Sequence, residues 1–225
     1  MKSFNKIRVF SAIMLVHVSL MFAQERWSAE LYGGLAGNVS LPIHIKQSGQ
    51  PSLDFIAKYE SRSLDLPIYY GYRLSKWCGD KSWELEFTHH KIYLSNNSPE
   101  IENFSLSHGL NMFTINRGRE LSGFVVRGGA GPVITHPEFT IRDVSFDQSR
   151  GLFHLGYMLN GLVLNLGVAH PIQLSKHFFL NLEAKTTFAY VHIKQDDLKV
   201  NVYNWAFHVI LGPEYIFGQK NAPFP

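Results

Sequence analysis

The stretch FFLNLEAKTTFAY, residues 178–190, shows the alternation that indicates the fold class. Apolar side chains occupy nearly every second position, and polar or charged side chains stand between them: Phe178, Leu180, Leu182, Ala184, Phe188 and Tyr190 against Asn181, Glu183, Lys185 and Thr187. Successive side chains of a β-strand point to opposite faces, so a period of two predicts a strand with one apolar and one polar face.

The same period recurs along the chain and predicts eight strands, at residues 27–38, 64–74, 83–90, 104–116, 122–133, 155–168, 178–190 and 204–217. The connections alternate in length. Residues 41–63, 95–103 and 134–154 are long and polar, whereas residues 76–82, 117–121 and 171–177 are short. This alternation is typical of outer-membrane barrels. The sequence therefore predicts an all-β fold, an eight-stranded antiparallel up-and-down transmembrane β-barrel.

A secreted soluble barrel of the lipocalin kind would show the same alternation, and two features favour the membrane barrel. Full charges crowd the polar faces, as a lumen network requires: Glu30, Asp65, Arg73, Glu84, Glu86, Arg127, Glu183, Lys185 and Glu214. Aromatic residues gather near the strand ends, as in the two girdles of a membrane barrel: Trp27, Trp83, Tyr93, Phe178, Tyr190, Trp205, Tyr215 and Phe217. Eight strands leave no room for a wide aqueous pore.

The N-terminus has the pattern of a cleaved secretory signal peptide. Lys2, Lys6 and Arg8 form a basic region, residues 9–22 are mostly apolar, and Ala23 is a small residue suited to the cleavage site. We therefore expect a signal peptide at residues 1–23 and an outer-membrane barrel domain at residues 24–225.

Composition excludes several classes of protein. The 225 residues carry 21 basic and 18 acidic side chains, a balance that does not fit a nucleic-acid-binding protein. Cys78 is the only cysteine, so the chain has no disulfide partner for it and no cysteine-based zinc site. The motifs GxSxG and HExxH of serine hydrolases and zinc proteases do not occur. An outer-membrane deacylase would need a His-x-Ser arrangement, and neither HGL at residues 108–110 nor HPE at 136–138 provides the serine.

Several short segments carry a resemblance to a known family. They are YGG at residues 32–34, LEFTHHKIY at 85–93, HGLN at 108–111, GGAGP at 128–132 and HPE at 136–138. Within the small outer-membrane β-barrel superfamily, these segments resemble the lipid A oxidase-like barrels of Gram-negative bacteria. The resemblance implies an enzyme of the cell outer membrane that acts in the outer leaflet, with lipid A or lipopolysaccharide as its partner.

This resemblance, together with residue chemistry, points to two groups of residues. Glu86, His90, His136 and Glu138 are the expected catalytic residues, with His108 as a further imidazole near the same rim. Two histidines and one carboxylate suit a divalent metal such as iron, which is the cofactor that oxygen-dependent oxidation would need.

His89 and Lys91 are the expected lipid-binding residues. By parity they face lipid, at a height where a lysine can reach anionic headgroups. The alternative function is a non-enzymatic structural, adhesive or ligand-binding barrel. A cluster of histidine and acidic side chains in a pocket that opens sideways to lipid would favour the enzyme, and scattered positions would favour the alternative.

Overall fold

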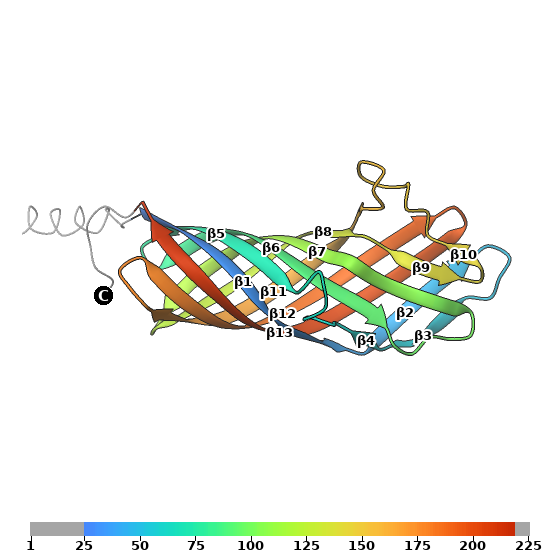
Figure 1. Ribbon diagram of the computed structural model, residues 1–225, viewed down its shortest axis with the longest axis horizontal. Helices are drawn as coiled ribbons and strands as arrows, with labels where there is room; N and C mark the ends of the chain where they lie inside the picture. The colour runs from blue at the N-terminus through green and yellow to red at the C-terminus, as the bar shows by residue number, and fades with distance from the viewer. Residues whose placement is uncertain (1–24, 219–225) are drawn as a thin grey trace, which may run out of the picture.

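The computed structural model describes residues 25–218, and its eight longest strands form a closed antiparallel barrel (Figure 1). These strands are β1 (Glu25–Val39), β5 (Tyr70–Cys78), β6 (Lys81–Leu94), β7 (Ile101–Leu121), β8 (Phe124–Thr135), β11 (Met158–Gln173), β12 (Phe178–Gln195) and β13 (Leu198–Phe217). Each pairs with the next, and β1 pairs with β13, which closes the ring. The predicted eight-stranded barrel is confirmed. The predicted signal peptide lies outside the described residues.

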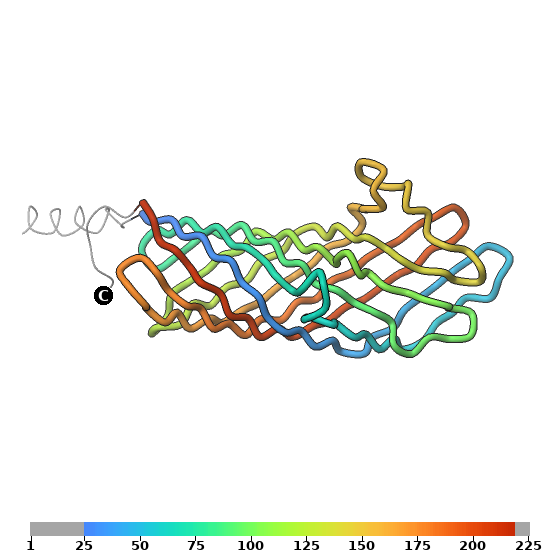
Figure 2. Tube along the Cα trace, viewed as in Figure 1, coloured from blue at the N-terminus to red at the C-terminus, as the bar shows by residue number. Residues whose placement is uncertain are grey.

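Five short strands extend the wall at one end of the barrel. They are β2 (Leu41–Gln47), β3 (Leu53–Ala57), β4 (Tyr59–Glu60), β9 (Glu138–Ile141) and β10 (Val144–Ser145). β2 pairs with β13 and β3, β9 pairs with β7 and β10, and β4 pairs with β6. We call this end the loop end. The opposite end, where the described chain begins and stops, is the turn end (Figures 1 and 2).

Two strands begin three or more residues later than the sequence predicted, because a loop takes the place of the first part of each predicted strand. Residues 64–69 form a loop rather than the first half of a strand, and β5 begins at Tyr70. Pro67 has no N–H to give to a strand ladder, which explains why alternation alone was misleading there. β11 begins at Met158 rather than at residue 155, because the preceding residues form a loop in which Gly156 has a φ of 75°.

The turn between β7 and β8 was also wrongly predicted. Residues 117–121 belong to β7, and the chain reverses at Ser122 and Gly123, which have φ values of 49° and 83°. Two successive residues with positive φ suit a tight two-residue hairpin whose twist matches the strands.

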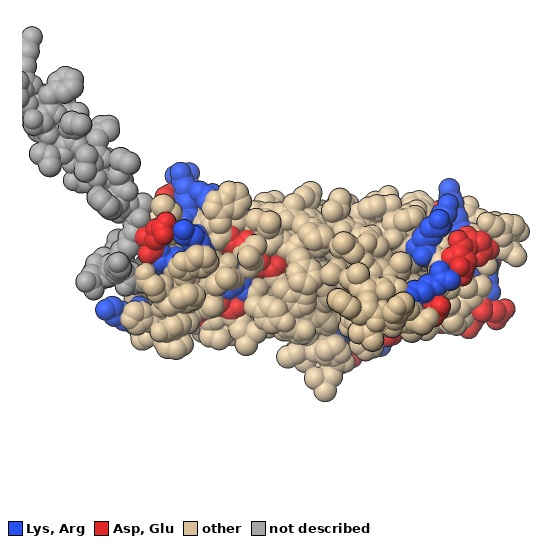
Figure 3. Space-filling view, turned by 90° about the horizontal axis from the view of Figure 1, so that it is seen from above, with Lys and Arg blue, Asp and Glu red and all other residues tan. Residues whose placement is uncertain are grey.

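An apolar band surrounds the ring of eight strands. Its exposed side chains include Leu31, Leu74, Leu85, Ile115, Leu164 and Leu211. Aromatic side chains border the band near the turn end, where Trp27 pairs with Phe217 and Phe178 pairs with Tyr215. Charged side chains gather toward the two ends of the face in Figure 3 and are sparse between them. This distribution is the one that a membrane-spanning barrel needs.

The lumen near the turn end contains a network of buried, paired charges. Three cations and four carboxylates meet there, all of them buried: Arg73, Arg127, Lys185, Glu30, Glu84, Glu86 and Glu183. Arg73 donates to Glu86 at 2.8 Å and to Glu183 at 2.9 Å. Arg127 lies 3.0 Å from Glu84, and Lys185 donates to Glu86 at 2.9 Å. Of the other charges expected in the lumen, Asp65 lies instead in the loop before β5, and Glu214 is half-buried and accepts a hydrogen bond from Asn181.

The barrel interior near the loop end is apolar. The side chains that fill it are buried and come from both the ring and the short strands, among them Ile43, Ile45, Ile92, Leu106, Val191 and Val200. The two halves of the interior therefore differ in chemistry, but both are packed with side chains. We therefore expect no open channel along the axis of the barrel that the described residues form.

The first prediction concerns orientation, with the loop end outside the cell and the turn end in the periplasm. The native Cys78 is exposed at the turn end, and Ser48 is exposed in the turn between β2 and β3 at the loop end. In intact cells an impermeant thiol reagent should label Ser48→Cys in a Cys78→Ser background and should leave Cys78 of the native chain unlabelled. Permeabilised cells are the control, in which both should react. Labelling of Cys78 in intact cells would show that the barrel has the opposite orientation.

The second prediction concerns the lumen network. Arg127→Leu leaves the carboxylates of Glu84 and Glu183 with one cation fewer in a buried site, which should cost about 3–5 kcal/mol. The temperature at which the folded barrel unfolds on a semi-native gel should fall clearly. Arg119→Leu, which removes an exposed ion pair with Asp80, is the matched control and should change little. Equal unfolding temperatures for the two variants would contradict the network's role.

Candidate functional site

A cavity of about 500 Å³ lies on the outside of the barrel wall. Strands β5 to β8 supply its base, mainly through Tyr70, Phe87, His89, Asn111, Phe113 and Ile134. His108 of β7 lies at its edge. Most of the lining is apolar or aromatic with a few polar groups, which is the usual make-up of a small-molecule site.

Two loops border the cavity. The β4–β5 loop, residues 61–69, contributes Pro67, and the β10–β11 loop, residues 146–157, contributes Leu152, Phe153, Leu155 and Tyr157. The β10–β11 loop stands off the barrel wall (Figure 2). Both loops also expose apolar side chains: Leu66 and Phe153 are each 88% exposed. Exposed apolar side chains beside an apolar cavity mark a surface suited to an apolar partner, such as a membrane, another protein or a ligand.

The structure places the two expected lipid-binding residues differently. His89 lines the cavity and is only 4% exposed, because its ring stacks on Tyr70 with a centroid distance of 5.0 Å. Its Nδ1 lies 2.8 Å from Oδ1 of Asn111. Lys91 is 2% exposed, and its Nζ donates to the backbone oxygen of Asp65 at 2.9 Å. His89 thus belongs to the cavity, whereas Lys91 fastens the β4–β5 loop over the wall.

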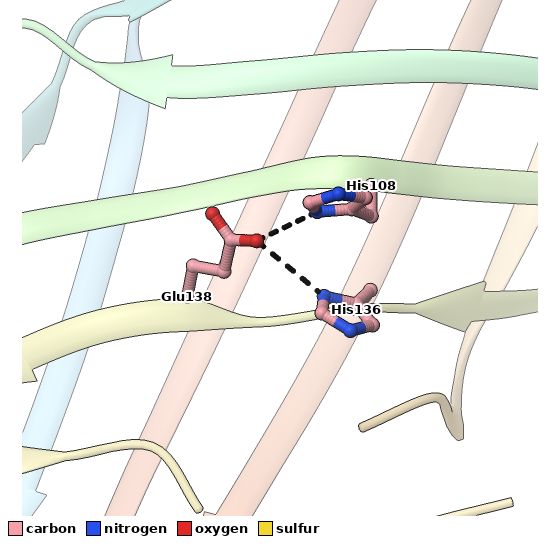
Figure 4. A group of neighbouring side chains, drawn as sticks. All are labelled: His108, His136 and Glu138. Atoms are coloured by element: carbon pink, nitrogen blue, oxygen red, sulfur yellow. Dashed lines mark hydrogen bonds and ion pairs between the residues drawn. The ribbon is translucent and has the colours of Figure 1, made fainter. Parts of the chain in front are cut away.

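Three side chains with metal-binding atoms meet beside the cavity, as Figure 4 shows. His108 comes from β7, Glu138 begins β9, and His136 lies in the short connection between β8 and β9. Oε1 of Glu138 lies 2.6 Å from Nδ1 of His108 and 3.8 Å from Nδ1 of His136. Oε2 of the same carboxylate accepts a hydrogen bond from Ser107 at 2.5 Å. The carboxylate is therefore held in place, with one oxygen facing both imidazoles.

A β-bulge in β7 creates this arrangement. His90 of β6 pairs with Leu110, but Ile92, two residues later, pairs with Leu106, so β7 contains extra residues at this point. Gly109 lies within the bulge with a φ of 123°, and its backbone oxygen accepts a hydrogen bond from the backbone N–H of His136. Bulges often redirect side chains at functional sites.

Burial lowers the pKa of His136, and the nearby His108 lowers it further, while the carboxylate of Glu138 acts in the opposite sense. His136 lies outside the membrane-spanning strands. The lowered pKa favours the neutral imidazole, and a neutral ring keeps a nitrogen lone pair that can accept a proton or bind a metal ion.

The structure separates the four expected catalytic residues. Glu86 belongs to the lumen network, and His90 lies inside the barrel, where its Nε2 is 3.1 Å from Oδ1 of Asn38. Only His136 and Glu138 come together on the outer wall. The expected convergence of Glu86 and His90 with them is not observed, because alternation turns even-numbered residues of β6 inward at this height.

His108, which the sequence analysis considered as a further imidazole, completes the outer-wall cluster. Ser107 and Tyr157 were missed. Gly109 was the available signal for the bulge, since glycine within a strand often marks one. The contribution of the β10–β11 loop had no signal in the strand pattern.

Comparisons with known proteins bear on the fold. No protein-family model and no curated protein matches the chain. Among solved structures, the outer membrane protein AlkL superposes with a TM-score of 0.50 at 10% identity, over 90% of this chain and 94% of AlkL. OprG from Pseudomonas aeruginosa is also similar, with a TM-score of 0.37 at 13% identity over 86% of this chain and 94% of OprG.

Ail, the attachment invasion locus protein of Yersinia pestis, gives a TM-score of 0.36 at 14% identity, over 87% of this chain and 99% of Ail. At such identities only the fold follows, and it follows from AlkL: the chain has the fold of the small outer-membrane β-barrels. This fold and the exposed apolar band are those of a membrane-spanning β-barrel, and they support the predicted location in the outer membrane.

The third prediction concerns the anchoring of the β4–β5 loop. Lys91→Met keeps the apolar stem but removes the hydrogen bond to Asp65, so the loop should open more often. Trypsin should then cleave after the exposed Arg62 faster than in the native barrel. The control is Lys58→Met, which removes an exposed lysine whose side chain does not hold the loop. An unchanged cleavage rate in Lys91→Met would show that other contacts hold the loop.

Proposed function

We propose that this outer-membrane barrel is an enzyme that modifies an outer-leaflet lipid of the lipid A or lipopolysaccharide class. The observation that carries the proposal is the position of the cluster His108, His136 and Glu138. It lies beside an apolar cavity on the outer wall, where a lipid can reach it from the membrane.

The shape and chemistry of the cavity support an acyl chain as its occupant. Its lining is largely apolar, and the two bordering loops carry Leu66 and Phe153 outward. Side chains of this kind are stable among lipid tails and unstable in water. An acyl chain can therefore enter between the loops without crossing an aqueous layer.

The polar groups at the cavity support chemistry on the lipid's headgroup side. Glu138 orients the imidazole of His108, and an oriented imidazole is a common general base or acid. His89 and Asn111 supply a second polar pair at the base of the cavity, suited to positioning a hydroxyl or amide of the substrate. The oxidase-like reaction comes from the sequence resemblance alone.

The proposal gives separate tasks to the residues expected to be catalytic. His136 and Glu138, with His108, take part in the chemistry, and His89 contacts the bound lipid. Glu86 and His90 stabilise the filled lumen, and Lys91 fastens a loop beside the site. A channel function is not supported, because paired charges and apolar side chains fill the interior of the described barrel.

The fourth prediction tests the function by mass spectrometry of lipid A. Lipid A should be compared between cells that lack the protein and cells that carry the native chain, His108→Ala or His136→Ala. The native chain should change the mass of lipid A, and both variants should abolish the change while folding normally. Gain of oxygen would identify oxidation, and loss of an acyl chain would identify hydrolysis.

A matched control comes from a second histidine–carboxylate pair. Nδ1 of His44 lies 2.6 Å from Asp54 in the β2–β3 hairpin, and neither residue lines the cavity. His44→Ala should therefore keep full activity. If lipid A has the same mass with and without the native protein under several growth conditions, the enzyme proposal is wrong, and a structural or adhesive barrel becomes the better account.

A further inference from the structure

His108, His136 and Glu138 are spaced like the ligands of a metal ion. One donor atom from each residue lies within 4.8 Å of the donor atoms of the other two. First-row metal ions bind imidazole nitrogen and carboxylate oxygen at about 2.0–2.2 Å, which puts neighbouring ligand atoms about 3 Å apart. The two distances to Oε1 of Glu138, 2.6 and 3.8 Å, lie on either side of that value. Small side-chain adjustments would therefore place all three atoms around one ion.

A second observation points to a missing ligand. Nδ1 of His136 is buried and has no hydrogen-bond partner. A buried polar atom without a partner is costly and rare in folded proteins. A metal ion between His136 and Glu138 would satisfy this nitrogen.

Neighbouring residues fix the positions of two of these side chains, Glu138 and His136. Ser107 fixes Oε2 of Glu138, which leaves Oε1 directed at the imidazoles. The ring of Tyr157 packs edge-on against the ring of His136, with a centroid distance of 4.7 Å. Gly156 allows this close packing, since a Cβ there would lie 2.8 Å from Nε2 of His136. Outer groups of this kind orient the ligands of metal sites in proteins.

We infer that His108, His136 and Glu138 bind one divalent transition-metal ion at the edge of the lateral cavity. Two imidazoles and one carboxylate suit iron, cobalt or zinc, whereas calcium and magnesium prefer oxygen ligands alone. Three protein ligands leave coordination positions open, and His108 borders the cavity, so an oxygen atom of a lipid headgroup can reach the ion. This role of the ion rests on the proposed function, but its binding does not require the lipid.

The fifth prediction is measured on the purified, folded barrel in detergent, without a histidine tag and after treatment with a chelator. Titration with Co²⁺ should give visible d–d absorption bands that saturate at one ion per chain. His108→Ala, His136→Ala and Glu138→Gln should each abolish the saturable bands. Ser107→Ala should weaken binding by about 10–100-fold, because Ser107 only orients the carboxylate. His44→Ala is the control and should bind Co²⁺ like the native chain.

The outcomes separate this inference from the proposed function. No saturable binding in the native chain, or native binding in His136→Ala, would overturn the metal site, and lipid A mass spectrometry would still test the enzyme. Binding that depends on all three residues, with lipid A unchanged in mass, would confirm the metal site and remove the proposed role in lipid modification.

Discussion

Every backbone N–H and C=O that faces lipid must find a partner within the protein, because hydrocarbon offers none. A strand can meet this condition only if both its edges are paired, so the sheet must close. In this chain the pairing of β1 with β13 completes the ring. Eight strands enclose a narrow interior, which side chains fill. The chemistry of the lumen and the position of the candidate site both follow from this closure.

In a narrow lumen, the polar faces of opposite strands must pack against one another. Charges that alternation directs inward are removed from water, and each is stable only if it is paired. The network around Arg73 and Arg127 meets this condition near the turn end. Near the loop end the inward residues are apolar. There the short strands β2 and β9 extend the wall around this apolar cluster. The candidate site, in contrast, lies on the outside of the wall.

The outside of a regular strand is a poor place for such a site, since it presents side chains at fixed spacing to lipid. The bulge in β7 breaks that regularity, and it brings Ser107 and His108 to the start of β9. The β10–β11 loop then adds a second wall, with Tyr157 packed on His136. The cluster thus depends on three separate parts of the chain and on one local departure from the strand pattern.

The sequence predicts the number of barrel strands, their faces and most charges of the lumen, because a period of two is a local property that survives in the folded barrel. Asp65 is the exception among these charges, since it lies in the loop before β5. The sequence misplaced residues 64–69, since alternation does not register the missing N–H of Pro67. It named His136, Glu138 and His108, but it grouped them with Glu86 and His90, which lie on the other side of the wall. Which histidines meet depends on strand register, on the bulge at Gly109 and on the path of the loops. These features are set by pairings between distant segments, so they become visible only in the folded barrel.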